Sequence, residues 1–355
     1  MSRTWIKALA VLALVQGVFT FLAWRSTFED KAPAVSLGFK ADEVKSLELE
    51  MPGKTLAMSR EGGAWVLPGS SGYPARIQKV KEILTKLESL ELGQPVARER
   101  TSHKRLKVAD ELYERKIRWG GGPGLIVGTS PSYNVIHVRL EGQDAVYQVE
   151  GLSAWDLGCE VRDWVNPEIL ALPLPDLRAF SIKSPAGECE FTKGAEGPWA
   201  AVTPSPNGEP LDVPSLNSIV GSVSYLSLEQ VLSHVSADAS AGWDSQLKAR
   251  GLEPAAMVLT LTSETSREVP LTAEEIKAQT TVSADGTEVP PVKKARSVHD
   301  RKVDVLRIGD EKDGLVAVTV EGRQTIYGVR REALARVLGF RPESLFKKTA
   351  PAPEK

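Results

Sequence analysis

Two stretches of the chain alternate hydrophobic and polar residues in the same order, and each contains a tryptophan. The alternating segments are residues 44–50, 55–60 and 65–67 in the first stretch, and residues 177–182, 189–193 and 199–202 in the second. Alternation with a period of two predicts strands that bury one face. Trp65 and Trp199 stand at the same place in the two stretches, and we expect both rings to fill the core over the strand pairs. The recurring order indicates an internal duplication, which more often builds a large surface than a reaction centre.

Each copy then has one segment of helical periodicity. Pro74 precedes the first helix and Gly93 follows it, while Asp212 can cap and Pro214 can open the second. The apolar positions that recur on one helical face are Ile77, Val80, Ile83, Leu84, Leu87 and Leu90 in the first copy, and Leu216, Ile219, Val220, Val223 and Leu226 in the second. We therefore expect one long helix over the sheet of each copy.

The second half of each copy is predicted to be antiparallel strands that break at glycines. These segments are residues 117–119, 124–128, 135–139 and 145–149 in the first copy, and residues 258–261, 305–309, 315–320 and 325–329 in the second. Tyr147 corresponds to Tyr327 in this alignment. Only the second copy carries an insertion, at about residues 263–302, which we interpret as a long loop or a hairpin excursion.

Each copy closes with an amphipathic segment that contains an arginine, Arg162 in the first and Arg341 in the second. A guanidinium group suits a structural junction, so we expect each arginine to pair with backbone or a carboxylate. The alternative is that the two arginines hold a planar carboxylate or phosphate ligand.

The predicted fold class is α+β, with two tandem repeats of antiparallel sheet covered by a long helix, preceded by one N-terminal transmembrane helix. The predicted divisions are an anchor at residues 1–25, a linker at 26–41, repeat one at 42–172, repeat two at 173–346 and a disordered tail at 347–355.

The anchor is predicted from an apolar run at residues 6–23, which is broken only by Lys7 and Gln16 and flanked by Trp5 and Trp24. Its length just suffices to cross a bilayer, and tryptophans are typical of the membrane interface. A cleaved secretory signal is the competing interpretation, but bulky residues occupy the expected cleavage site. We therefore expect an uncleaved signal anchor that holds the protein to the membrane through residues 5–24.

The charge and the reactive side chains of the sequence do not point to a nucleic-acid, metal or catalytic site. The net charge of −2 and a basic run at residues 292–302 that lacks aromatic residues argue against a nucleic-acid partner. The four histidines, His103, His137, His234 and His299, are scattered singly, so we expect no metal site. No triad or phosphate-binding loop is recognisable, and we expect no catalytic residue and no cofactor.

The two cysteines, Cys159 and Cys189, leave two alternatives open. They could form a disulfide that stabilises the protein by roughly 3 to 4 kcal/mol, or they could be two unrelated buried thiols. Burial as separate thiols is the interpretation we favour.

The order of several short motifs resembles the bacterial proteins grouped as domain of unknown function 4340. The motifs are the turn at residues 62–65, the Tyr-Pro-Ala helix entry at 73–75, the strands at 133–139 and 147–149, and the Val-Arg-Asp close at 161–163. Arg76, where an acidic residue often stands, and the insertion depart from the pattern. The resemblance implies anchored, exported proteins of repeated α+β units, many of them similar to auxiliary components of ABC-type transport systems of the gliding-motility kind.

Together these observations predict a non-catalytic interaction protein of the bacterial inner membrane, single-pass, with the bulk of the chain in the periplasm. Its expected partner is a protein of the cell envelope, such as a transporter permease. The alternative is an exported ligand-binding module with a groove between the two repeats. Because the scaffold is common to both copies, the insertion is the expected place for specificity.

Overall fold

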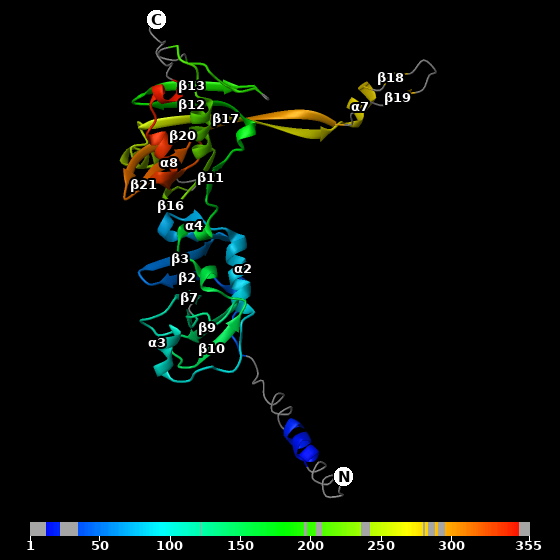
Figure 1. Ribbon diagram of the computed structural model, residues 1–355, viewed down its shortest axis with the longest axis vertical. Coiled ribbons are helices and arrows are strands. Elements are labelled where there is room, and N and C mark those ends of the chain that lie inside the picture. Colours follow the sequence, from blue (N-terminus) through cyan, green and yellow to red (C-terminus); the bar gives the residue numbers. More distant parts are fainter. Residues whose placement is uncertain are drawn as a thin grey trace, which may run out of the picture. The chain divides into compact units, whose positions relative to one another are not determined.

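The computed structural model describes residues 12–21, 35–120, 122–194, 197–203, 208–235, 242–279, 281–282, 288–289 and 295–347. In this part the protein is a mixed α/β structure with two large antiparallel sheets (Figure 1). Two compact units can be distinguished. The first unit contains residues 35–67 and 74–160, and the second contains residues 68–73 and 161–347. The boundary between the two units falls between residues 160 and 161, which is earlier in the chain than the predicted boundary between residues 172 and 173.

The first unit is built on an eight-stranded sheet with the order β10-β9-β8-β7-β2-β3-β4-β5. Its strands are β2 (Ser46–Met51), β3 (Lys54–Glu61), β4 (Ala64–Leu67), β5 (Tyr73–Pro74), β7 (Arg115–Trp119), β8 (Leu125–Val127), β9 (Val135–Leu140) and β10 (Val146–Glu150). Leu47 and Leu49 of β2 are buried while their neighbours are more exposed, so the alternation read from the sequence is the alternation of the two sheet faces.

Helix α2 (Ile77–Glu88) supplies the other side of this core through Val80, Ile83, Leu84 and Leu87, which are all buried. The helix is shorter than the predicted stripe. Ile77 is 39% exposed at its first position, and Leu90 is buried but lies beyond the last turn.

Shorter elements complete the first unit. They are β1 (Val35–Ser36), which pairs with β6 (Glu91–Leu92), the helical turns η1 (Ala41–Glu43), η3 (Arg100–Ser102) and η4 (Ala154–Leu157), and the one-turn helix α3 (His103–Leu106). The end of α3 approaches β8 closely: a Cβ atom at Gly128 would lie 2.1 Å from the Leu106 carbonyl oxygen. Only glycine permits this approach.

The second unit has an eight-stranded sheet with the order β14-β13-β12-β17-β20-β21-β22-β16. Its strands are β12 (Leu177–Ser184), β13 (Gly187–Lys193), β14 (Trp199–Ala201), β16 (Gln230–His234), β17 (Met257–Pro270), β20 (Ala295–Lys312), β21 (Leu315–Val320) and β22 (Thr325–Arg330). The other elements are η2 (Pro68–Ser70), α4 (Val161–Trp164), η5 (Leu174–Asp176), α5 (Val213–Ser224), α6 (Trp243–Ala249), α8 (Arg331–Leu338), η6 (Pro342–Leu345), and β11 (Glu168–Ala171) paired with β15 (Tyr225–Ser227).

Helix α5 covers the second core with four of the five predicted apolar positions, and the fifth, Leu226, lies in β15. A close approach also occurs in this unit, because a Cβ atom at Gly309 would lie 2.2 Å from the Arg250 carbonyl oxygen at the end of α6.

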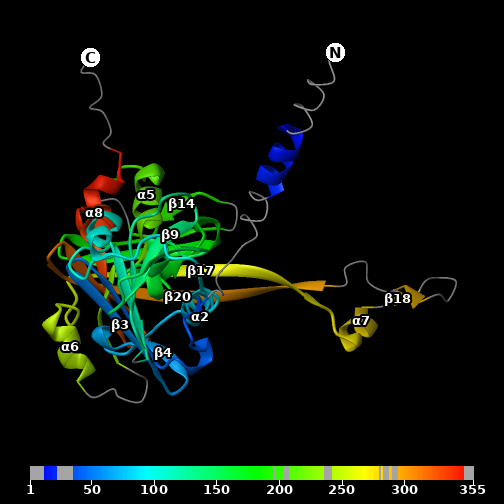
Figure 2. The ribbon, with the colours of Figure 1, turned by 90° about the horizontal axis from the view of Figure 1, so that it is seen from below.

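Strands β17 and β20 extend well beyond the sheet that contains them (Figures 1 and 2). They pair with each other continuously from Met257 with Ile308 to Pro270 with Ala295. Strand β12 stops pairing with β17 at Ser263, and β21 begins pairing with β20 at Leu306. Residues 264–270 and 295–301 therefore form a two-stranded ribbon, which we call the arm. The predicted insertion is thus a hairpin excursion, and α7 (Ala273–Gln279), β18 (Thr281–Val282) and β19 (Glu288–Val289) follow the arm.

At the N-terminus, residues 12–21 are helical, and the rest of the predicted 5–24 span lies outside the described residues. Within the described ranges, no helix is both long enough and apolar enough to cross a bilayer. The predicted tail is described only at residue 347.

Candidate functional site

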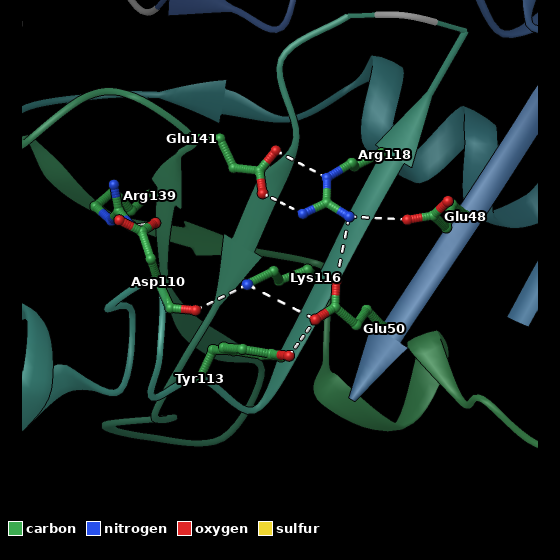
Figure 3. Close-up of polar contacts among 8 residues, drawn as sticks. All are labelled: Glu48, Glu50, Asp110, Tyr113, Lys116, Arg118, Arg139 and Glu141. Atoms are coloured by element: carbon green, nitrogen blue, oxygen red, sulfur yellow. Dashed lines mark hydrogen bonds and ion pairs between the residues drawn. The ribbon is translucent and has the colours of Figure 1, made fainter. Parts of the chain in front are cut away.

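The densest group of polar side chains lies on one face of the first sheet, and we call it the charged face. It consists of Glu48, Glu50, Asp110, Tyr113, Lys116, Arg118, Arg139 and Glu141 (Figure 3). Strand register brings the group together, because Glu48 pairs with Arg118 and Glu50 pairs with Lys116 across β2 and β7. The residues between them, such as Leu49 and Ile117, point into the core.

Arg118 is the centre of the charged face. Its guanidinium binds the Glu141 carboxylate with two hydrogen bonds of 3.0 and 2.6 Å, and it also donates to Glu48 at 2.8 Å and to Glu50 at 3.1 Å. The hydrogen bonds from Arg118 hold the pKa of Glu141 below its usual value, against the effect of burial. A Cβ atom at Gly124 would overlap the Glu141 carboxylate, so that glycine leaves the space for this bidentate pair.

Tyr113 and Lys116 surround Glu50 on its other side. The Tyr113 hydroxyl donates to the Glu50 carboxylate, while the Lys116 ammonium lies 3.8 Å from the same carboxylate and 3.9 Å from the centre of the Tyr113 ring. The hydrogen bond from Tyr113 is the main cause of a lowered pKa at Glu50, and the same bond raises the pKa of Tyr113 to about 12.

Arg139 is almost wholly buried, at 2% exposure, and joins a loop to the sheet. Its guanidinium donates to the Val108 carbonyl at 2.6 Å, to the Gln143 carbonyl at 2.8 Å and to Asp110 Oδ1 at 2.5 Å. The hydrogen bond from Arg139 lowers the pKa of Asp110. Arg139 thus fixes the loop before β7 and the turn after β9.

A cavity of about 260 Å³ opens beside Asp110 and Arg139. Its charged lining is paired internally, since Arg100 binds Asp144 at 2.8 Å and Lys104 binds Glu111 at 3.1 Å. Acid–base catalysis at neutral pH needs groups whose pKa values are brought toward 7. In the charged face the pKa shifts of Glu50 and Tyr113 run the other way, because the hydrogen bond between them lowers the first and raises the second.

A smaller polar cluster lies around Tyr73, the first residue of β5, which is grouped with the second unit although Pro74 is grouped with the first. The pKa of Tyr73 is raised to about 12, mainly by burial and to a smaller extent by the hydrogen-bonded Tyr327 hydroxyl. The His234 ring lies edge-on to Tyr73 at 5.1 Å, and its Nδ1 atom is 2.9 Å from the Thr325 hydroxyl. Burial lowers the pKa of His234, which keeps the imidazole neutral. Tyr73 and Tyr327 were singled out separately in the sequence, and the structure places them together.

The other residues singled out in the sequence have structural contacts. Trp65 and Trp199 are buried, at 4% and 6% exposure. Tyr147 pairs with Val138 and Tyr327 with Val318, at matching positions of the two sheets. Arg162 binds the Glu229 carboxylate at 3.0 Å, and Arg341 donates to the Phe340 carbonyl at 3.2 Å. These are the carboxylate and backbone partners that we expected of the two arginines.

The two cysteines lie in different units. Cys159 and Cys189 are both buried thiols, at 3% exposure each. The thiol of Cys159 lies 3.8 Å from the Leu157 carbonyl, whereas Cys189 pairs through its backbone with Ile182 inside the second sheet. Each thiol is buried within its own unit, and the choice between a disulfide and two separate thiols stays a prediction.

Among the described residues, no group of three or more histidine, cysteine, aspartate or glutamate side chains could hold a metal ion. His137 shows what a single histidine does here, since its Nδ1 atom contacts the Thr129 carbonyl at 2.8 Å. The charged face was not predicted from the sequence. The signal was present in the alternating Glu48 and Glu50 of one strand and Lys116 and Arg118 of another.

Comparison with known proteins gives one match. No curated protein and no solved structure matches the chain. A family model described as "Domain of unknown function (DUF4340)" matches residues 65–246, which are 182 of the 355 residues. The match runs from β4 to α6 and includes the Tyr-Pro-Ala entry and the Val-Arg-Asp close. The chain therefore belongs to the DUF4340 family.

Proposed function

We propose that the protein is a membrane-tethered, non-catalytic scaffold of the cell envelope that binds a protein partner through the arm. In this proposal the folded units are exported and the protein is an auxiliary component of an ABC-type transport or envelope complex. The observation that carries the proposal is the arm itself, a long ribbon formed by two strands of one sheet that continue into solvent. The transport role has its support in the family resemblance alone.

The proposal includes a tandem duplication of one α+β unit, and the order of elements supports it. When the strands of each sheet are listed from the corresponding edge, the order β4-β3-β2-β7-β8-β9-β10 in the first sheet matches the order β14-β13-β12-β17-β20-β21-β22 in the second. The pairs β1 with β6 and β11 with β15 also correspond, as do α2 with α5 and α3 with α6. Gly128 and Gly309 make the same close approach to the end of the preceding short helix.

Within this common scheme the arm is the largest difference between the copies. Strands β7 and β8 are joined by residues 120–124, whereas their counterparts β17 and β20 extend into the arm and are joined beyond it by residues 271–294. A two-stranded ribbon is marginally stable in water. The described arm has an ion pair of 3.0 Å between Arg267 and Asp300, and the His299 Nδ1 atom lies 2.9 Å from the Glu264 carboxylate, but the arm has few apolar contacts. A partner that packs on the arm would bury side chains that the arm leaves exposed. The two strands of the arm also have unpaired edges, to which a strand of the partner could be added.

The tether is supported by the composition of the N-terminal helix. Residues 12–21 expose Leu12, Leu14, Val15, Val18, Phe19 and Phe21, each by more than half. A helix that is apolar on every side is typical of a membrane segment and not of a surface helix. The proposal extends this helix over the predicted span of residues 5–24.

The experiment replaces residues 264–301 by the Gly-Gly-Pro-Gly turn found at residues 121–124, so that the second hairpin takes the length of the first. The tagged full-length chain and the shortened chain are purified from gently solubilised membranes. We expect the full chain to retain a stoichiometric membrane protein and the shortened chain to lose it. Both chains should unfold at the same denaturant concentration, because the arm lies outside the core. Absence of a stoichiometric partner, or capture that is unchanged by the deletion, would contradict the proposal.

The second candidate is a ligand-binding module, favoured by a cavity of about 570 Å³ in the second unit. It lies among β16, the end of α6 and the turn between β20 and β21, and it is lined by charged residues such as Arg250, Asp310 and Lys312. A thermal shift with a small charged ligand that Asp310→Ala abolishes would favour this function over the scaffold.

A further inference from the structure

Two aromatic side chains of the first unit are almost fully exposed. Tyr133 is 99% exposed and Trp155 is 90% exposed, whereas Trp65 and Trp119 of the same unit are buried. An aromatic ring gains a large amount of burial when it is covered, so a fully exposed tryptophan on a folded surface calls for an explanation.

Trp155 is held on a rigid turn. It belongs to η4, where Asp156 accepts hydrogen bonds from the Ser153 amide at 2.9 Å and from the Ser153 hydroxyl at 2.8 Å, which completes a capping box. The Lys86 ammonium of α2 donates to the other Asp156 oxygen at 2.9 Å, and Leu157 anchors the turn in the core. The hydrogen bonds that hold this turn therefore keep the Trp155 side chain exposed.

Tyr133 lies at the same end of the first sheet. Strands β9 and β10 end their pairing at Val135 and Glu150, and just beyond this pair the Gly151 amide donates to the Asn134 carbonyl at 3.3 Å. Tyr133 directly precedes Asn134, and η4 begins three residues after Gly151. Both rings thus project from the loops at one edge of the unit.

The second unit provides an internal comparison. Trp155 is the second residue of η4, which follows β10, and Glu332 is the second residue of α8, which follows β22. Tyr133 and Asp313 each stand two residues before a strand, β9 and β21, and both acidic residues are exposed. The scaffold therefore accepts a charged residue at either position. The comparison indicates that the fold does not require an aromatic residue at either position.

We infer that Trp155 and Tyr133 rest in the headgroup region of a lipid bilayer and orient the first unit on the membrane. The inference rests on the proposed tether. Residues 25–34 separate the proposed span from β1, and ten residues reach at most about 35 Å. Strand β1 pairs with β6, which begins five residues after Lys86, the residue that supports the Trp155 turn. The point where the chain enters the unit and the exposed tryptophan are therefore close along α2.

The local chemistry fits this occupant. Tryptophan and tyrosine are enriched at the membrane–water interface because their rings are apolar and their N–H and O–H groups can stay hydrated. Two acidic residues near Trp155 in the sequence are paired with lysines, Asp156 with Lys86 and Glu160 with Lys54, whereas Glu150 at the end of β10 is exposed. The residues around Tyr133 are Ser132 and Asn134, which carry no charge.

The test places a fluorescent probe on the full-length chain in vesicles of phosphatidylethanolamine and phosphatidylglycerol. Trp155→Cys and Tyr133→Cys are labelled with an environment-sensitive dye, and Glu332→Cys is the matched control in the second unit. The native thiols are buried and stay unlabelled in the folded protein. We expect lipids brominated near the headgroup to quench the probes at 155 and 133 severalfold more than the probe at 332.

The outcomes separate this inference from the tether. Extraction of the chain from the vesicles at alkaline pH would refute the tether and the inference with it. A chain that resists extraction while the probes at 155 and 133 are quenched no more than the probe at 332 would overturn the inference alone. Shielding of the two probes only after a purified membrane protein is added would assign the aromatic pair to a protein contact, and it would also overturn the inference.

Discussion

Replacement of Arg139 by methionine should destabilise the first unit while leaving the second unchanged. Methionine fills the space of the aliphatic stem but cannot donate hydrogen bonds. The Val108 carbonyl, which lies in a fully buried residue, loses its donor at 2.6 Å, and an unsatisfied buried acceptor costs about 2 kcal/mol. The Gln143 carbonyl can be rehydrated and costs about 1 kcal/mol. Asp110 adds little, because its side chain is 77% exposed. The expected loss of unfolding free energy is therefore about 3 kcal/mol.

Urea unfolding followed by tryptophan fluorescence and circular dichroism measures this loss. With a denaturant dependence of about 1.5 kcal/mol per molar urea for a unit of this size, the midpoint of one transition should fall by about 2 M. Arg100→Met is the matched control. Arg100 also binds an aspartate beside the same cavity, but its side chain is 82% exposed, and we expect no measurable change. Equal midpoints for the two variants would refute the assignment of Arg139 as the residue that fixes the loop.

Three further predictions concern pH, backbone contact and the thiols. Three carboxylates of the charged face, Glu50, Asp110 and Glu141, have pKa values below their unfolded values of about 4. Their stabilising effect is therefore complete above about pH 4 and is lost as the pH falls through the folded pKa values. The urea midpoint of the first unit should drop steeply below about pH 4, and less steeply in the Arg118→Gln variant. Gly128→Ala should cost about 3 kcal/mol in the same assay, because the added carbon meets backbone, whereas Gly93→Ala, with open space around it, should cost far less; equal effects would disprove the close approach. Cys159 and Cys189 should react with a thiol reagent only in urea, and rapid reaction in the native protein would contradict their burial.

The regular elements were predictable because their residues carry a period. Leu47 and Leu49 alternate with glutamates, and the stripe from Val80 to Leu87 repeats every three or four residues. The helix ends were less predictable, since Leu90 continues the apolar stripe after the backbone has left the helix. The arm had no such signal, because both of its faces are polar and its strands are defined by backbone pairing.

The candidate site was only partly predictable. The alternating charges of Glu48 and Glu50 are visible in the sequence, but their partners depend on strand register, which places Arg118 beside them from 68 or 70 residues away. The role of Arg139 depends on which loop covers its face of the sheet. Tyr73 finds its hydrogen-bond partner in the other half of the sequence, at Tyr327. Contacts of this kind follow from tertiary structure and leave no local pattern.

The position of the arm in its sheet has a mechanical consequence. Strands β17 and β20 are the fourth and fifth of eight in the sheet order, so the arm is continuous with the two middle strands. Tension applied to the arm would run along these strands and load the hydrogen bonds to β12 and β21 in shear, all at the same time. Sheets resist force in this direction far better than the peeling of an edge strand, one bond after another. Anything bound at the arm could therefore pull on the protein without unravelling it from the side.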